Sequence, residues 1–245
     1  MPRVAADILT DPPPPPADER IVYGPEPLQF GDLRRADSDA LAVVLHGGAW
    51  KATYNLIHTG HLCVALRDAG IATWNVEYRR VGDPGGGWPA MLEDVLHAVE
   101  HARTLAERLV LVGHSAGGHL ALLAAARVQL PVVAIAAVCD PATWDHPAVP
   151  LLLGDERPPE ASPLAQLPLG SPAILVHGTA DEVVPFDQSK RYAEAAGAEL
   201  VPLEGAGHFE PIDPQSREWT AVRDAIRTLA AVRPSRWVNP RESRS

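Results

Sequence analysis

Ser115 lies in a stretch of the chain whose residue types and spacing favour nucleophilic chemistry. The stretch reads Gly113-His114-Ser115-Ala116-Gly117, which has the Gly-x-Ser-x-Gly spacing of a nucleophile elbow. Apolar residues before it predict a buried strand, and a run rich in alanine and leucine after it predicts a helix. A serine at such a turn has a strained backbone, and the two glycines leave space where larger side chains would collide. The pattern therefore predicts a serine hydroxyl held above the sheet edge, beside a helix N-terminus.

A serine hydroxyl needs a base that removes its proton, and the base needs a third group that fixes its tautomer. His208 and Asp181 are the expected base and acid, because each follows a predicted strand further along the chain. Two other acids are open to the same role. Asp140 follows the preceding strand, and Glu182 is adjacent to Asp181, although its side chain is expected to point the other way.

Acyl transfer through a serine also needs hydrogen-bond donors for the oxyanion of the tetrahedral intermediate. The backbone N–H of Ala116, just after the serine, is one expected donor. The loop His46-Gly-Gly-Ala-Trp follows another buried strand and is expected to supply more donors, from Gly48 and Ala49. We expect His46 to orient this loop through hydrogen bonds and His114 to be a packed neighbour of the elbow.

Three aromatic residues are expected near the serine, where they would make a tight, flat, apolar substrate pocket; the alternative is that the tryptophans are core residues. Trp50 flanks the oxyanion loop, Trp144 begins a proline-rich segment, and Phe209 follows the expected base. Such a pocket favours an aryl formamide or a short aryl ester. It predicts that kcat/KM falls steeply beyond about four acyl carbons.

The segment His97-Ala-Val-Glu-His101 matches the H-x-x-E-H pattern of zinc peptidases. Its helix is expected to lie away from the strand ends where the serine is placed, so we interpret it as an exposed helix face. His58 and His61 are likewise expected on a helix surface. This interpretation predicts no metal site and requires no cofactor.

Strands and helices are expected to alternate along the whole chain, which is typical of a mostly parallel sheet covered on both faces by helices. At the carboxyl ends of such strands the loops collect the chemistry, and the expected site residues all lie in loops of this kind. The expected strands cover residues 21–24, 28–33, 41–45, 71–76, 109–112, 132–138, 173–176 and 199–203, and the expected helices cover residues 55–69, 88–99, 120–126, 185–196 and 214–231.

One α/β domain is expected over residues 20–232, with a proline-rich arm before it at 1–19 and a basic tail after it at 233–245. Within the domain, residues 140–171 are rich in proline and lack periodicity, so they are expected to form a short cap over the site. The simplest interpretation is that the arm is a spacer on the surface and that the tail is solvated.

The formal net charge of −10 over 245 residues argues against nucleic acid or an anionic membrane as a partner. No apolar run approaches the length of a membrane span, and the N-terminus lacks the apolar region of a signal peptide. Cys63 and Cys139 lie far apart and are expected to be free thiols. Together these features predict a cytoplasmic protein.

The chain resembles α/β-hydrolase-fold serine hydrolases over nearly its whole length. Within that fold, the His-Gly-Gly-x-Trp form of residues 46–50 is similar to kynurenine formamidases (arylformamidases) and related small carboxylesterases. The resemblance implies Ser115, Asp181 and His208 as a catalytic triad and an oxyanion hole at residues 47–49. Position 49 is alanine where the hormone-sensitive-lipase type has a third glycine, which weakens a lipase-like interpretation. The supporting stretches are Tyr23-Gly24-Pro25, Asn75-Val76-Glu77-Tyr78-Arg79, Trp88-Pro89 with Asp94, and Gly207-His208-Phe209.

The sequence thus predicts a serine hydrolase that cleaves a small-molecule ester or amide through an acyl-enzyme, with an arylformamide as the sharpest expectation. A thioesterase, or a cyclising or C–C-cleaving enzyme, would use the same residues and stays open. A non-catalytic binding protein would not need the serine, the acid, the histidine and the oxyanion loop together. The sequence leaves the oligomeric state open.

Overall fold

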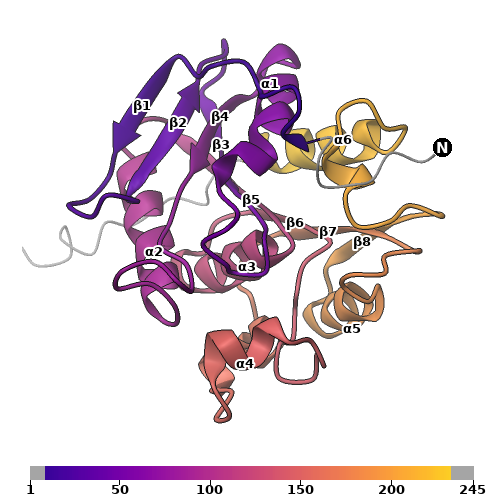
Figure 1. Cartoon of the computed structure of the whole chain (residues 1–245). Coiled ribbons are helices and arrows are strands. Elements are labelled where there is room, and N and C mark those ends of the chain that lie inside the picture. Colours follow the sequence, from indigo (N-terminus) through magenta and orange to yellow (C-terminus); the bar gives the residue numbers. More distant parts are fainter. Residues whose placement is uncertain (1–8, 233–245) are drawn as a thin grey trace, which may run out of the picture.

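A single mixed sheet forms the centre of the computed structural model, which describes residues 9–232. Within this range the sheet has eight strands in the order β1-β2-β4-β3-β5-β6-β7-β8 (Figure 1). β1 and β2 pair antiparallel at one edge, β2 pairs antiparallel with β4, and the other pairs are parallel. The strands are β1 Glu19–Val22, β2 Phe30–Arg34, β3 Ala40–Leu45, β4 Ala72–Val76, β5 Arg108–His114, β6 Val132–Ile135, β7 Ala173–Gly178 and β8 Glu199–Leu203.

Helices cover both faces of this sheet, as the alternation of elements predicts. Residues that alternate along β3 separate into two cores, because side chains on a strand point to opposite faces. Leu41, Val43 and Leu45 pack on the side of α2 and α3, whereas Ala42 and Val44 pack on the side of α1 and α6. The helices are α1 Gly60–Asp68, α2 Ala90–Ala102, α3 Ala116–Val128, α4 Ala148–Leu153, α5 Asp187–Ala196 and α6 Trp219–Ala230.

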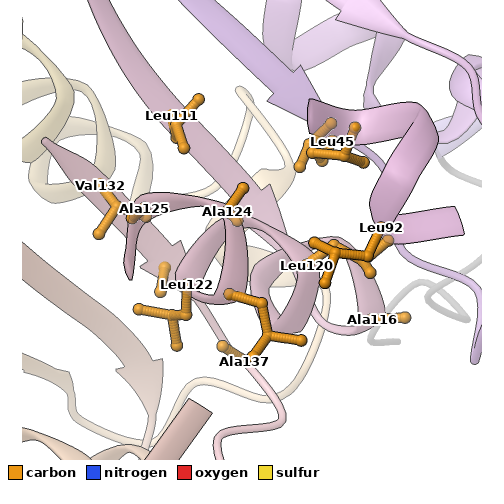
Figure 2. Packing of buried hydrophobic residues seen from close by; sticks show 14 of the residues in the cluster. Leu45, Leu92, Leu111, Ala116, Leu120, Leu122, Ala124, Ala125, Val132 and Ala137 are labelled. Atoms are coloured by element: carbon orange, nitrogen blue, oxygen red, sulfur yellow. The ribbon is translucent and has the colours of Figure 1, made fainter. Parts of the chain in front are cut away.

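The helix α3 is central to the fold and begins directly after Ser115. Most of its side chains are small or apolar and buried, so it packs closely against β5, β6 and α2. Figure 2 shows Leu120, Leu122 and Ala124 of α3 in one cluster with Leu92 of α2 and Leu111 of β5. Burying one such leucine contributes about 1.5–3 kcal/mol, so this packing fixes the position of the helix N-terminus behind the serine.

The segment at residues 140–171 contains α4 and two 3-10 helices, η3 Pro159–Ala161 and η4 Pro163–Gln166. Two hydrogen bonds join the start of the segment to its second half: Ser162 Oγ donates to Asp140 (3.0 Å), and Leu164 N donates to the Cys139 carbonyl (3.0 Å). The preceding strand β6 is shorter than predicted, because Ala136 has a φ of 45° and ends the extended run.

The described part of the proline-rich arm packs on the domain rather than projecting from it. Leu9 is buried among α1 and α6 residues. The Pro12 carbonyl accepts a hydrogen bond from His61 Nε2, and the Pro15 carbonyl accepts one from Arg34, both at 2.8 Å. Residues 1–8 and the basic tail at 233–245 lie outside the described residues. In the described range no helix has the length and apolar character needed to cross a membrane.

Candidate active site

Ser115 occupies the sharp turn between β5 and α3, with φ 56° and ψ −118°. This is a left-handed backbone conformation that a non-glycine residue rarely adopts, and it is stored strain of the kind found at functional sites. The strain persists because the turn is closely packed on both sides. A Cβ at Gly113 would overlap the Gly117 carbonyl, and a Cβ at Gly117 would overlap the carbonyls of Leu45 and His46. Both glycines are therefore required by space, as the spacing of the motif predicts.

His208 and Asp181 form a hydrogen-bonded pair beside this turn. His208 lies in the loop after β8 and Asp181 in the loop after β7. The distance from His208 Nδ1 to Asp181 Oδ2 is 2.7 Å. The two side chains are buried, with only 4% of the His208 side chain and 0% of the Asp181 side chain exposed. Since a carboxylate only accepts hydrogen bonds, His208 carries its proton on Nδ1 and keeps the lone pair of Nε2 free.

The structure records no hydrogen bond between Ser115 Oγ and His208 Nε2 among the described residues. In enzymes without substrate this contact is often long and tightens only in the complex. His114 instead connects the two loops: its Nε2 donates to the His208 carbonyl (2.9 Å), and the two rings are 4.7 Å apart. His114 is buried, as expected of a packed neighbour of the elbow, and it also fixes the position of the His208 loop.

Asp181 accepts four hydrogen bonds, which use both of its oxygens. Oδ1 accepts from the backbone N–H groups of Val183 and Val184, each at 2.8 Å. Oδ2 accepts from His208 and, at 3.1 Å, from His177 Nε2. Burial alone would raise the pKa of Asp181, but the hydrogen bonds from the two histidines and Val184 hold it well below its ordinary value. The carboxylate is therefore ionised at neutral pH.

His177 is a supporting residue that the sequence analysis did not identify. It is fully buried at the end of β7, and its Nδ1 lies 2.7 Å from Ser189 Oγ. Its four-residue spacing to Asp181, across a turn at a strand end, is the only signal in the sequence, and that spacing is common. The ring bonds the same carboxylate oxygen as His208 and so helps to orient Asp181.

The two alternative acids lie elsewhere. Asp140 accepts hydrogen bonds from the hydroxyls of Thr143 (2.8 Å) and Ser162 (3.0 Å), so it anchors the segment at residues 140–171. Glu182 is exposed at the surface. Among the three acids considered, the structure brings Asp181 into contact with His208.

The loop after β3 has three consecutive residues with positive φ: Gly48 at 118°, Ala49 at 50° and Trp50 at 59°. A Cβ at Gly48 would overlap Tyr54, which packs on this loop from outside. Backbone hydrogen bonds within the described residues do not use the N–H groups of Gly48 and Ala49. The N–H of Ala116 is in the first turn of α3, where helical N–H groups have no acceptor inside the helix. These three N–H groups are the oxyanion donors that the sequence predicts, and that role stays a prediction.

A buried ionic network holds this loop from behind. His46 Nε2 lies 2.9 Å from Glu77 Oε1, and Arg80 lies 3.2 Å from the same oxygen. Burial opposes the ionised form of Glu77, but the charge and hydrogen bond of His46 and the charge of Arg80 lower its pKa below the ordinary value. The ring of His46 also stacks on Tyr78, whose hydroxyl donates to the His46 carbonyl (2.7 Å). His46 therefore orients the loop, as expected, and Glu77 is the anchor.

The three aromatic rings expected in one pocket divide into two groups. Trp50 is 1% exposed and packs edge-on against Trp144 (6.1 Å) and His119 (5.4 Å), in the core on the α3 side. Trp144 also lines a surface groove of about 450 Å³ near Glu182 and Val183. Phe209 lies apart from the tryptophans and packs edge-on against His208, at 4.9 Å. Trp50 is therefore a core residue that supports the oxyanion loop in this structure.

His58 is buried, which corrects the expectation that it lies on a helix surface. It belongs to the 3-10 helix η2 (Leu56–Thr59) and is only 6% exposed. Its ring lies 5.8 Å from that of His114 and 5.7 Å from that of Phe209. The helical spacing in the sequence does not reveal this burial, because η2 turns more tightly than the α-helix expected over residues 55–69.

No group of three metal-ligating side chains lies close enough to hold an ion within residues 9–232. His97 lies exposed on α2, and the ring of His101 packs against Trp74 at 5.6 Å. The absence of a metal requirement stays a prediction, which chelation tests. Both cysteines are buried and unpaired.

The sequence is similar to known esterases and to a formamidase. The BD-FAE family model matches residues 33–133, which contain the oxyanion loop and the elbow. Esterase LipC of Mycobacterium tuberculosis is 27% identical over an alignment that covers 79% of this chain and 60% of that protein. Kynurenine formamidase of Meyerozyma guilliermondii is 36% identical over 42% of this chain and 40% of that protein. The chain thus spans less than two thirds of the length of these curated relatives.

Solved esterase structures share the fold. Esterase 2 of Thermogutta terrifontis, phosphonylated by sarin, superposes with a TM-score of 0.74 at 22% identity, over 87% of this chain and 94% of that chain. A truncated carbohydrate esterase from gut microbiota gives 0.72 at 20% identity, over 90% of this chain and 100% of that chain. These findings confirm the predicted fold and the predicted resemblance.

Proposed function

We propose that this protein is a serine hydrolase of the α/β-hydrolase superfamily that cleaves a small ester or amide through an acyl-enzyme. One observation carries the proposal. The strained turn of Ser115 lies beside the hydrogen-bonded pair of His208 and Asp181. Among the described residues the N–H groups of Gly48 and Ala49 have no backbone acceptor, and that of Ala116 is in the first turn of α3, where helical N–H groups have no acceptor inside the helix.

In the proposed first step, Ser115 Oγ attacks the substrate carbonyl while His208 Nε2 takes the hydroxyl proton. The carbonyl oxygen becomes an oxyanion, which accepts hydrogen bonds from Gly48, Ala49 and Ala116. As the C–O or C–N bond to the leaving group breaks, His208 returns the proton to the leaving oxygen or nitrogen. Asp181 stays ionised throughout, because its hydrogen bonds hold its pKa well below the ordinary value.

Water completes the reaction by the same route. His208 removes a proton from water, the hydroxide oxygen bonds to the acyl carbon, and the bond to Ser115 Oγ breaks with return of the proton to the serine. No proton or electron is left over, and no cofactor is required for the balance. Removing one oxyanion donor in other serine hydrolases costs about 10²–10³ in kcat, so the loop is expected to contribute a similar factor.

An aryl formamide or a short-chain aryl ester is the substrate class that we propose. The similarity to kynurenine formamidase and the lack of a long apolar insert both support a small acyl group. The segment at residues 140–171 has only short helices, and its apolar side chains are largely used in packing against the domain. Phe209 beside His208 gives an aromatic leaving group a ring to pack on.

The test is a series of p-nitrophenyl esters from acetate to decanoate, compared with an N-formyl aryl amine. We expect kcat/KM to be highest for acetate to butyrate and the formamide to be hydrolysed. A maximum at octanoate or longer would contradict the small acyl site. Hydrolysis of short esters without formamide turnover would support the serine hydrolase and remove the formamidase assignment. Thioesters of the same acyl groups, run in parallel, test the thioesterase alternative.

A further inference from the structure

His58 is a buried polar side chain that the serine mechanism does not use. Neither of its ring nitrogens has a hydrogen-bond partner in the described residues, although the side chain is 6% exposed. Burial, and to a smaller degree the charges of His46 and His208, lower the pKa of His58 to about 4. The ring is therefore neutral near pH 7, with one nitrogen that donates and one that accepts. Buried polar groups without partners destabilise a fold, so this ring requires an explanation.

The neighbours of His58 place it on the His208 side of the nucleophile. Its ring lies 5.8 Å from that of His114, which precedes Ser115 and donates to the His208 carbonyl. It lies 5.7 Å from the ring of Phe209, which follows His208. Tyr54, at 6.2 Å, is 43% exposed, so this group of rings reaches solvent.

The leaving group of the substrate must also lie on this side. In the proposed mechanism the leaving oxygen or nitrogen receives its proton from His208 Nε2, and this transfer requires the two atoms to be within hydrogen-bond distance. A group attached to the leaving atom would extend past His208 toward its neighbours Phe209 and His58. The acyl group, by contrast, projects away from the proton donor.

We propose that His58 binds a hydrogen-bonding substituent on an aryl leaving group, and that Tyr54 and Phe209 form the aromatic walls of this subsite. The inference rests on the proposed serine hydrolase function and adds a specificity residue to it. A neutral imidazole can donate to a carbonyl or accept from an N–H. A carboxamide on the ring of a phenol or aniline has both a C=O and an N–H, so it can bond whichever nitrogen of His58 faces it. A site built for such a group discriminates against an analogue that lacks it.

The test compares matched substrates in matched variants. The first set contains 2-, 3- and 4-carbamoylphenyl acetate, each paired with the isopropylphenyl acetate of the same shape. The second pair moves the amide to the acyl side: phenyl succinamate and phenyl 4-methylpentanoate. The quantity measured is the ratio of kcat/KM for the amide to kcat/KM for its apolar partner. The difference in intrinsic reactivity between the two esters is the same for every variant, so a change of this ratio between variants reports on recognition of the amide by the protein.

In at least one positional isomer, His58→Phe should lower this ratio about tenfold, the factor expected for loss of a hydrogen bond to a buried neutral partner. His58→Gln, which keeps a donor and an acceptor, should restore part of it. The matched control is His61→Phe on α1, whose ring binds the Pro12 carbonyl. This control should leave the ratio within about twofold, since its ring lies outside the site.

A thermal readout separates a binding role from a structural one. His58→Phe should raise Tm, because the substitution removes two unpaired buried nitrogens. A lower Tm with equal losses for the amide and its apolar partner would show that the ring is structural, and would overturn the proposal. A ratio unchanged in all three isomers, or changed only in the acyl pair, would also overturn it. If the wild-type protein hydrolyses neither these esters nor the N-formyl aryl amine, the proposed function itself is wrong; hydrolysis with an unchanged ratio refutes only the role of His58.

Discussion

Asp181→Asn should lower kcat about 10⁴-fold without unfolding the protein. This factor corresponds to a loss of about 5.5 kcal/mol of transition-state stabilisation. The backbone N–H groups of Val183 and Val184 both donate to Oδ1 at 2.8 Å, so an asparagine must turn its carbonyl oxygen toward them. Its NH₂ group then faces His208 Nδ1, at the place where the carboxylate accepts at 2.7 Å. The opposite flip would place the NH₂ group against the two backbone donors.

The amide would therefore force His208 into the other tautomer. With Nδ1 accepting from asparagine, the proton moves to Nε2, and the atom that should take the Ser115 proton no longer has a free lone pair. The carboxylate is ionised across the assay range, because its hydrogen bonds hold its pKa well below the ordinary value. The loss should consequently be similar at each pH from about 6 to about 9.

Asp140→Asn is the matched control for this substitution. Asp140 accepts from the hydroxyls of Thr143 and Ser162, which can rotate to accept from an amide instead. We expect a loss of less than about fivefold in kcat, because this residue anchors the segment at 140–171 and does not contact His208. The assay is hydrolysis of p-nitrophenyl acetate, with circular dichroism to confirm that both variants fold. A larger loss in the Asp140 variant would refute the assignment of the acid.

Three further predictions follow from buried groups and close contacts. Burial lowers the pKa of His119 to about 4, below the unfolded value of about 6.5, so the free energy of unfolding falls as pH drops between these values. Between about pH 8 and about pH 4, the free energy of unfolding measured in urea should therefore fall by about 3 kcal/mol less in His119→Gln than in the wild type. Gly117→Ala places a Cβ on the Leu45 carbonyl and should reduce the unfolding free energy by about 1–3 kcal/mol while abolishing most turnover. Chelation with EDTA should leave kcat/KM unchanged, as should His97→Ala combined with His101→Ala; activity that zinc restores would contradict this.

Much of the fold and site could be predicted from local sequence, since the relevant signals are short. The apolar runs of β3, β5 and β7 are fully or almost fully buried, and the loops after them contain the expected residues. The spacing of Gly113, Ser115 and Gly117 implies the close packing that the structure has. Such patterns follow from backbone sterics within a few residues.

The supporting residues could not be predicted, because their roles depend on contacts between distant segments. Glu77 acts on His46 from 31 residues away, and it is buried where the ends of the adjacent parallel strands β3 and β4 meet. His58 is buried by the His208 loop, which lies far along the chain, so its helical spacing gave no sign of it. The burial of Trp50 also depends on distant contacts: it is adjacent in sequence to the expected oxyanion donors, yet its ring packs in the core against His119 and Trp144.

Covalent labelling of Ser115 tests the central claim most directly. The purified protein is treated with a fluorophosphonate, and the adduct is located by mass spectrometry of its peptides, with His208→Ala as the control. The account predicts one adduct, on Ser115, formed with loss of esterase activity, and labelling of the His208 variant slower by at least about 10³-fold, because that variant lacks the base that activates the serine. Esterase activity that survives full labelling of Ser115, or no labelling of Ser115 in an active preparation, would contradict it.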